Sequence, residues 1–205
     1  MITGVDVSGN NGAFKTDEAG AWQAVVNSGH SFAFVKASEG TGYRFARLAR
    51  WAEMARESGL AVGSYHFAKP DAGAGDAEAE AKHYAACMAG VPLDLPPVLD
   101  LESTGLDARR TVDWALHFAH VIYAETGRLP MLYTYTAFWK GALGKTGDLT
   151  HLPLWQADYR TTPAVLAPWG TPAIWQYTGK GALMGFPGAI DLNRSDLTLD
   201  VLRAL

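Results

Sequence analysis

The chain has 205 residues and a formal net charge of -4, from 17 basic and 21 acidic side chains. This balance lacks the basic surface of a nucleic-acid binder, so we expect no nucleic-acid partner. No stretch approaches the roughly 18 apolar residues of a membrane span, so we also expect no membrane insertion. The single cysteine, Cys87, excludes an intrachain disulfide and a CxxC metal site, and we expect its thiol to be a small buried hydrophobe.

Short apolar runs alternate with longer amphipathic segments in the first two thirds of the chain, which is typical of βα units around a parallel sheet. We predict strands at residues 3–8, 31–37, 60–67, 98–102 and 130–134. Helices should open near Thr16 or Asp17 and end at Gly29, and should cover residues 45–58, 75–89 and 107–126.

The last third is mostly β, with strands predicted at residues 152–157, 173–177 and 189–193 between short Gly/Pro loops, and a final helix at 195–205. This order predicts an α/β fold, an irregular TIM-like barrel of about eight strands with about five helices. Without a repeat or linker, we expect a single domain over residues 1–205.

Polar side chains gather at the carboxyl ends of the predicted strands, where a β/α barrel builds its active site. These positions are Asp6 and Ser8; Lys36, Ser38 and Glu39; Tyr65 and His66; Asp100 and Glu102; Tyr133 and Thr134; and Asp191 with Asn193. A distributed pattern of this kind is more specific than any one motif.

Asp100 and Glu102 form the sharpest feature, because residues two apart on a strand face the same side with Cα atoms roughly 6.5 Å apart. Two such acids should disturb each other's titration, one staying neutral as a general acid and the other anionic. The alternative, a solvent-facing pair on an edge strand, is disfavoured by the apolar Val98, Leu99 and Leu101.

Each of the remaining polar candidates has a structural alternative to a role in the site. Asp6 and Asp191 should be neighbours if the barrel closes, although either could be a structural cap. Glu39 could be a site residue or the ion-pair partner of Lys36, and His66 is expected to be an inner hydrogen-bonded histidine. The chain holds no HExxH motif or Cys/His cluster, so we expect no metal and no other cofactor.

Aromatic and amide side chains concentrate in the last third of the chain. Trp and Tyr near strand ends can stack on sugar faces, and amides can bind hydroxyl and acetamido groups. Carboxylates, aromatics and amides together indicate a carbohydrate site, although each Trp alone is more often core. The residues are Trp139, Trp155, Gln156, Tyr159, Trp169, Trp175, Gln176, Tyr177 and Asn193.

Eight motifs in register resemble the glycoside hydrolase family 25 (Chalaropsis-type) lysozymes, which cleave peptidoglycan. They lie at residues 4–8, 34–40, 63–67, 99–102, 132–134, 154–157, 174–178 and 188–193. The resemblance implies N-acetylmuramidase activity on peptidoglycan glycan strands, with Glu102 as general acid. Asp6, Asp100 and Asp191 match the other family acids, and the candidate substrate-binding residues are Glu39, Tyr65, Tyr133, Trp155, Gln156, Gln176, Tyr177 and Asn193. We expect a monomer.

The second step of such a hydrolysis has three possible routes. Direct attack by a carboxylate needs acids about 5 to 5.5 Å apart, and inversion needs about 6.5 to 9.5 Å. The third route uses the substrate's own 2-acetamido oxygen. We favour this route, with Asp100 orienting the acetamido group and net retention at the sugar.

Two other functions remain open at this stage: a barrel that binds wall glycans without cutting them, and a chitinase on the same fold. The four acids argue against the binder. The N-terminus shows no signal peptide. A wall hydrolase of this kind fits a phage endolysin released through holin pores, or a secreted enzyme given without its leader; Met1 directly before the first strand favours the endolysin.

Overall fold

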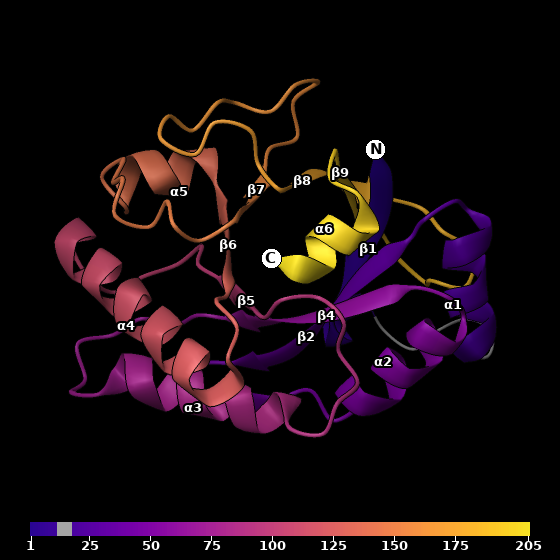
Figure 1. Cartoon of the computed structure of the whole chain (residues 1–205), viewed down its shortest axis with the longest axis horizontal. Helices are drawn as coiled ribbons and strands as arrows, with labels where there is room; N and C mark the ends of the chain where they lie inside the picture. Colours follow the sequence, from indigo (N-terminus) through magenta and orange to yellow (C-terminus); the bar gives the residue numbers. More distant parts are fainter. Residues whose placement is uncertain (12–17) are drawn as a thin grey trace.

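The computed structural model describes residues 1–11 and 18–205, and within these ranges eight strands close into a barrel and one further strand lies outside it. Each barrel strand pairs with the next and the last returns to the first (Figure 1). In order around the barrel they are β1 (Ile2–Val7), β9 (Ile190–Ser195), β8 (Ile174–Gly181), β7 (Leu154–Ala157), β6 (Met131–Tyr135), β5 (Val98–Asp100), β4 (Ala61–Phe67) and β2 (Phe32–Glu39). The predicted irregular α/β barrel is confirmed.

The strands run parallel from β1 through β2 and β4 to β8, and β9 runs antiparallel to both of its neighbours. A parallel connection needs a long crossover, whereas β8 and β9 are joined by the short segment 182–189. The start of β9 therefore lies at the same rim as the carboxyl ends of the parallel strands. This brings Asp191 opposite Asp6 in the β1–β9 register, as the predicted closure required.

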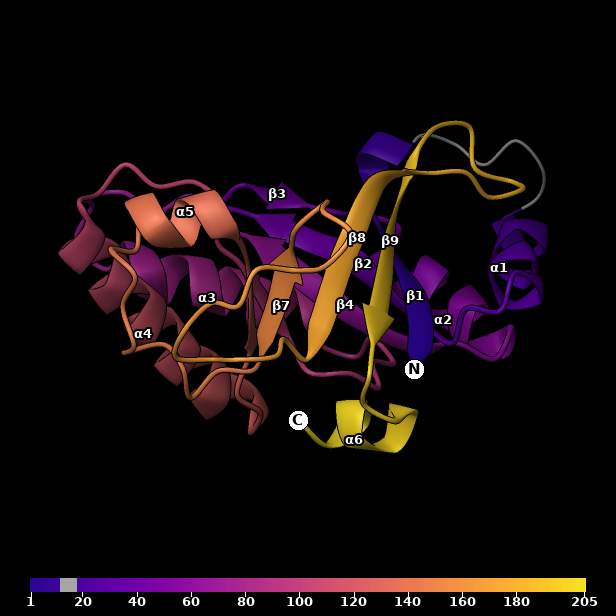
Figure 2. The ribbon, with the colours of Figure 1, turned by 90° about the horizontal axis from the view of Figure 1, so that it is seen from above.

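Four helices, α1 (Glu18–Asn27), α2 (Leu48–Glu57), α3 (Asp76–Met88) and α4 (Ala108–Thr126), flank the part of the barrel that contains β2, β4 and β5, whereas loops border β7 to β9 (Figure 2). Helix α4 shows how local sequence sets the bounds. Asp107 caps its first turn by accepting a hydrogen bond from Arg110 N, and Gly127 ends it at a φ of 72°. Its buried face includes Ala115, Phe118 and Ile122.

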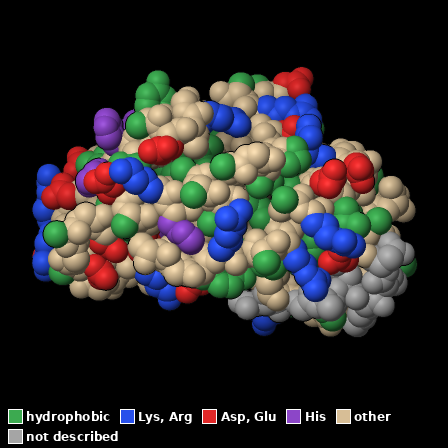
Figure 3. Space-filling model, turned by 90° about the horizontal axis from the view of Figure 1, so that it is seen from below, with side chains coloured by type: hydrophobic (Ala, Val, Ile, Leu, Met, Phe, Trp, Pro, Cys, Tyr) green, Lys and Arg blue, Asp and Glu red, His purple; other side chains and the backbone are tan. Residues whose placement is uncertain are grey.

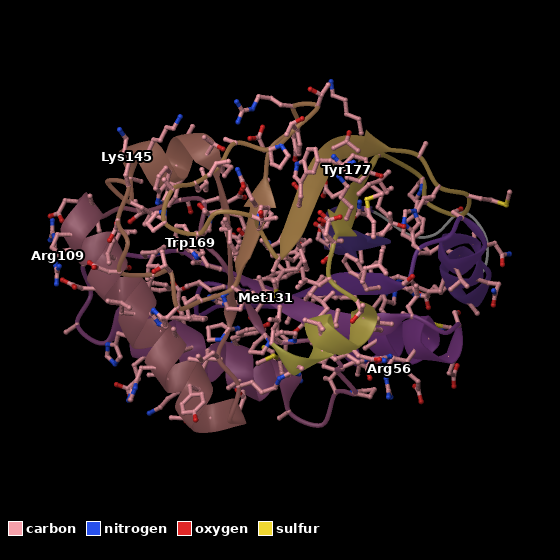
Figure 4. The ribbon with its side chains drawn as sticks, turned by 45° about the horizontal axis from the view of Figure 1, so that its top comes forward. Arg56, Arg109, Met131, Lys145, Trp169 and Tyr177 are labelled. Carbon is pink, nitrogen blue, oxygen red and sulfur yellow. The ribbon has the colours of Figure 1, made fainter. Side chains whose placement is uncertain are left out.

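Two hydrophobic clusters hold the elements together. The outer one lies between the helices and the barrel wall and includes Trp22, Trp51 and Phe118. The inner one fills the barrel around Phe34 and Met131, the latter labelled in Figure 4. Helix α6 (Leu199–Ala204) adds Leu202 to this inner cluster. Because packed side chains occupy the interior, room for a ligand is left at the carboxyl-end rim.

Several boundaries differ from the predictions. Strand β5 ends at Asp100, so Glu102 lies beyond it, and the final helix begins at Leu199 because β9 continues to Ser195. Strand β3 (Tyr43–Arg44), the single-turn η1 (Gly9–Asn11) and helix α5 (Thr136–Gly141) were not predicted, since such short elements depend on tertiary contacts. The predicted helix start near Thr16 or Asp17 lies outside the described residues.

Charged side chains of both signs are interspersed over the face shown in Figure 3. In the described part of the chain, no helix combines the length and apolarity that crossing a membrane requires. Cys87 is a buried free thiol in α3, as predicted.

Candidate active site

A cavity of about 270 Å³ opens at the rim where the carboxyl ends of the parallel strands meet. Acids, aromatic rings and one lysine surround it, and every parallel barrel strand or the loop that follows it contributes. The lining residues are Asp6, Ser8, Lys36, Tyr65, Phe67, Asp100, Glu102, Tyr133, Trp155, Tyr159, Gln176 and Asp191. The structure thus brings the four predicted acids into one pocket.

Asp100 is the last residue of β5 and is buried. Burial raises the pKa of Asp100 well above its usual value, and the charge of Glu102 raises it further. Its Oδ1 atom is buried without a hydrogen-bond partner among the residues that the structure describes. A buried carboxyl oxygen without a partner, on a residue that lines a cavity, can accept a hydrogen bond from a ligand if the site opens slightly to admit it.

Glu102 is half-buried, two residues after Asp100. The chain past β5 stays beside β6 because Leu101 N donates to Tyr133 O at 2.9 Å and Thr134 Oγ1 donates to Leu101 O at 2.9 Å. Burial raises the pKa of Glu102, the charge of Lys36 opposes the rise, and Asp191 adds to it. From the sequence we expected one of Asp100 and Glu102 to be neutral and the other anionic. In the structure, burial raises the pKa values of both.

Asp6 is buried on β1, and its Oδ2 atom accepts two hydrogen bonds from amides. Gln176 Nε2 donates over 3.0 Å and Asn193 Nδ2 over 2.7 Å. Burial, followed by the charge of Asp191, raises the pKa of Asp6 to about 7. Asp191 is half-buried, and burial raises its pKa as well.

Aromatic donors fix these two amides. Tyr133 and Tyr159 donate from their hydroxyls to Gln176 Oε1 at 3.1 Å and 2.9 Å. Trp155 donates from Nε1 to Asn193 Oδ1 at 2.8 Å. The floor of the pocket is therefore a connected hydrogen-bond network. In each amide the oxygen accepts from an aromatic side chain and the nitrogen donates to Asp6.

Tyr65, Tyr133, Trp155 and Gln176 line the pocket, as proposed for substrate-binding residues, but four other candidates lie outside the lining. Asn193 lies beneath it, bonded to Asp6. Glu39 pairs with Lys36 at 2.6 Å and with Lys69 at 3.2 Å, which is the ion-pair alternative for that residue.

Gln156 and Tyr177 are also turned away from the cavity. Gln156 is buried and donates to Thr136 Oγ1 and Ala164 O. Tyr177, which is labelled in Figure 4, packs its ring edge-on against Trp175. The Arg194 guanidinium lies over the Trp175 ring, 3.6 Å from its centre. Neither side chain lines the cavity.

Four lining residues were absent from the list of candidate substrate-binding residues: Ser8, Lys36, Phe67 and Tyr159. Of these, Tyr159 was among the aromatic side chains that indicated a carbohydrate site. Ser8, Lys36 and Phe67 lie at or close to the carboxyl ends of predicted strands, so their positions could have predicted that they line the pocket. Tyr159 comes from the loop after β7, and no local pattern aims that loop at the pocket. His66 is the inner hydrogen-bonded histidine that was predicted, between Ser38 Oγ at 2.9 Å and Glu80 Oε2 at 2.7 Å.

Within the described ranges, no three His, Cys, Asp or Glu side chains are grouped as a metal site would require. The titratable groups that line the pocket are four carboxyls, one lysine and three tyrosines. Two acids of raised pKa beside aromatic rings at the rim of a β/α barrel define an acid–base hydrolase of the glycosidase type.

The chain belongs to the glycosyl hydrolases family 25, whose family model matches residues 5–186. Among curated relatives, Lysozyme M1 of Streptomyces globisporus is 32% identical over 205 aligned residues, covering 94% of this chain and 67% of the relative. The N,O-diacetylmuramidase of Chalaropsis sp is 33% identical over 191 residues, covering 84% of this chain and 89% of the relative.

Solved structures agree with this assignment. A bacterial lysozyme from Streptomyces coelicolor superposes with a TM-score of 0.86 at 29% identity, covering 100% of this chain and 96% of the other. A family GH25 lysozyme from Aspergillus fumigatus gives 0.83 at 27% identity, covering 99% and 97%. The chain is a glycoside hydrolase with lysozyme-type activity, an enzyme class that hydrolyses peptidoglycan.

Proposed function

We propose that this enzyme is an N-acetylmuramidase that cleaves the bond between N-acetylmuramic acid and N-acetylglucosamine in bacterial cell walls, with Glu102 as general acid. The observation that carries the proposal is the pairing of half-buried Glu102 with buried Asp100 in one acidic, aromatic-lined pocket. The names of the relatives Lysozyme M1 and N,O-diacetylmuramidase support the substrate class.

Glu102 suits the acid role because it is held at the rim yet reaches the cavity. Its raised pKa keeps the carboxyl protonated at higher pH than an exposed glutamate would be. In the first step, Glu102 gives its proton to the glycosidic oxygen while the bond from that oxygen to the anomeric carbon breaks. In the second step, the resulting carboxylate takes a proton from the attacking water.

Asp100 suits the role of orienting the substrate's 2-acetamido group. Among the described residues no donor reaches Asp100 Oδ1, and an acetamido N–H would supply one. A hydrogen bond to the charged form lowers the pKa of a carboxyl, so substrate binding would favour the Asp100 anion at this buried position. The oriented acetamido oxygen then attacks the anomeric carbon, and an oxazolinium forms that water opens with net retention.

The test compares wild type, Glu102→Gln and Glu125→Gln on purified cell walls, followed by mass spectrometry of the fragments. Glu125 is an exposed acid on α4 and serves as the matched control. We expect wild type and Glu125→Gln to clear the walls and release new reducing-end muramic acid. Glu102→Gln should lose about 100-fold or more of the activity, the usual scale for a general acid.

Each alternative predicts a different result. A wall-binding barrel would show no clearing with any of the three proteins, and a chitinase would prefer chitin and release its oligomers. Near-normal turnover by Asp100→Asn would remove Asp100 from the orienting role. Inverted configuration in the first-formed product would exclude the acetamido route.

A further inference from the structure

The Asp6 carboxyl is held by two amides whose orientation the structure settles. The Trp155 indole N–H can only donate, so Asn193 must turn Oδ1 toward it and Nδ2 toward Asp6. Gln176 Oε1 receives two tyrosine hydroxyls, so its Nε2 likewise faces Asp6. Asp6 Oδ2 therefore accepts two N–H hydrogen bonds. A proton on this oxygen would point at those donors, so protonation at Oδ2 is unfavourable.

The other side of the same carboxyl faces Asp191. The two residues are direct partners across the antiparallel β1–β9 pair, so their carboxyl groups lie side by side, and the charge of Asp191 raises the pKa of Asp6. Two adjacent anions would repel each other, whereas a single proton on one of them lets that carboxyl donate a hydrogen bond to the other. With Oδ2 taken by the amides, the position left for a proton on Asp6 is Oδ1.

We propose that Asp6 works as a neutral carboxylic acid, with its proton on Oδ1 donated to Asp191, so that Asp191 is held as the anion of the pair. Asp6 is then a positioning residue, and Asp191 is the group that presents negative charge to the pocket. The inference deepens the muramidase proposal and rests on it for the part that concerns activity.

The electrostatic surroundings agree with this arrangement. Burial and then the charge of Asp191 raise the pKa of Asp6 to about 7, against the hydrogen bonds from Asn193 and Gln176, which lower it. The interaction with Asp6 works to lower the pKa of Asp191. The Asp191 charge in turn raises the pKa of Glu102, which helps to keep the general acid protonated. The other titratable and charged groups that line the same pocket are Lys36, Tyr65, Asp100, Glu102, Tyr133 and Tyr159.

The first test uses Asp6→Asn, Asp6→Leu and Asp191→Asn in the wall-clearing assay. An asparagine at position 6 reproduces the neutral acid, because its oxygen accepts from both amides and its nitrogen donates to Asp191. We expect Asp6→Asn to stay within about tenfold of wild type, and Asp6→Leu and Asp191→Asn to lose about 100-fold. If Asp6→Asn is as inactive as Asp6→Leu, Asp6 is needed as an anion and the proposal is wrong.

The second test needs no substrate. A raised pKa in the folded state adds stability that is complete below the unfolded pKa of about 4 and is lost as pH rises through about 7. Asparagine does not titrate, so the Tm of Asp6→Asn minus that of wild type should become more positive between pH 4 and pH 8. A difference that stays flat over this range overturns the proposal.

The two tests separate the proposals. If wild type fails to cleave walls, the muramidase proposal fails, while the pH dependence of the Tm difference still reports where the proton lies. If walls are cleaved and the Tm difference is flat, the neutral Asp6 is wrong and the function stands.

Discussion

Lys36 Nζ lies 2.6 Å from Glu39 Oε2 and 4.7 Å from the centre of the Phe67 ring. Lys36 is buried and lines the acidic pocket. Its charge works to lower the pKa values of both Asp100 and Glu102, against the burial that raises them. The Lys36 charge thus limits how far the pKa values of Asp100 and Glu102 rise.

Replacing Lys36 by methionine should move the alkaline limb of the activity profile to higher pH. Removing the positive charge favours the protonated form of Glu102, so the general acid keeps its proton longer; we expect a shift of about half to one pH unit. The measurement is kcat/KM against pH on soluble peptidoglycan. Lys69→Met is the matched control, because Lys69 pairs with the same Glu39 at 3.2 Å but does not line the pocket. An equal shift in the control would contradict the assignment.

Replacing Tyr159 by phenylalanine should reduce activity more than stability. The side chain is 62% exposed, yet its hydroxyl donates to Gln176 Oε1 and helps to aim that amide at Asp6. We expect kcat/KM to fall about three- to tenfold, the scale of one hydrogen bond, with a loss of unfolding free energy below about 0.5 kcal/mol. Tyr123→Phe, at a 53% exposed position on α4, should change neither.

Replacing Asp158 by alanine should destabilise the loop that carries Tyr159. Asp158 pairs with Arg160 at 2.5 Å and accepts from Ala164 N at 2.8 Å. The Arg160 hydrogen bond, against the effect of burial, lowers the pKa of Asp158 to about 2. Losing a nearly buried acceptor of this kind should reduce the free energy of unfolding by about 1 to 3 kcal/mol at pH 7.

The same substitution has a pH signature. A lowered pKa contributes stability that is present above the unfolded value of about 4 and is lost as pH falls through about 2. The Tm difference between wild type and Asp158→Ala should therefore shrink as pH falls from 6 to 3. Asp148→Ala, at an exposed acid 3.7 Å from Arg109, should show a small difference at every pH; a large one there would remove the special role of Asp158.

Replacing Gly63 by alanine should destabilise the barrel interior. A Cβ atom there would overlap the Phe34 ring and lie 2.9 Å from Leu95 Cβ. Both neighbours belong to the inner cluster and are fixed by packing, so we expect a loss of about 1 to 3 kcal/mol in urea unfolding. Gly188→Ala meets nothing within 4 Å and should be nearly neutral. Equal effects at the two positions would mean that the interior can relax around the extra methyl group.

Much of the fold could be predicted because its signals are local. The apolar runs that became β2 and β4 and the capped amphipathic segment that became α4 each identify themselves within about 20 residues. The two-residue β3 and the six-residue α5 carry no comparable pattern. Their hydrogen bonds form because neighbouring elements place them, which no window along the chain records.

The site divides in the same way. The sequence by itself determined which acids could do the chemistry, since Asp6, Asp100, Glu102 and Asp191 stand at strand ends that any closed barrel would gather at its rim. Tertiary structure alone decided their electrostatic roles. Barrel closure buries Asp6 against Asp191, aims Gln176 and Asn193 at one oxygen, and leaves Asp100 Oδ1 without a donor in the described residues. Burial and hydrogen-bond geometry, which set pKa values, exist only once distant strands meet.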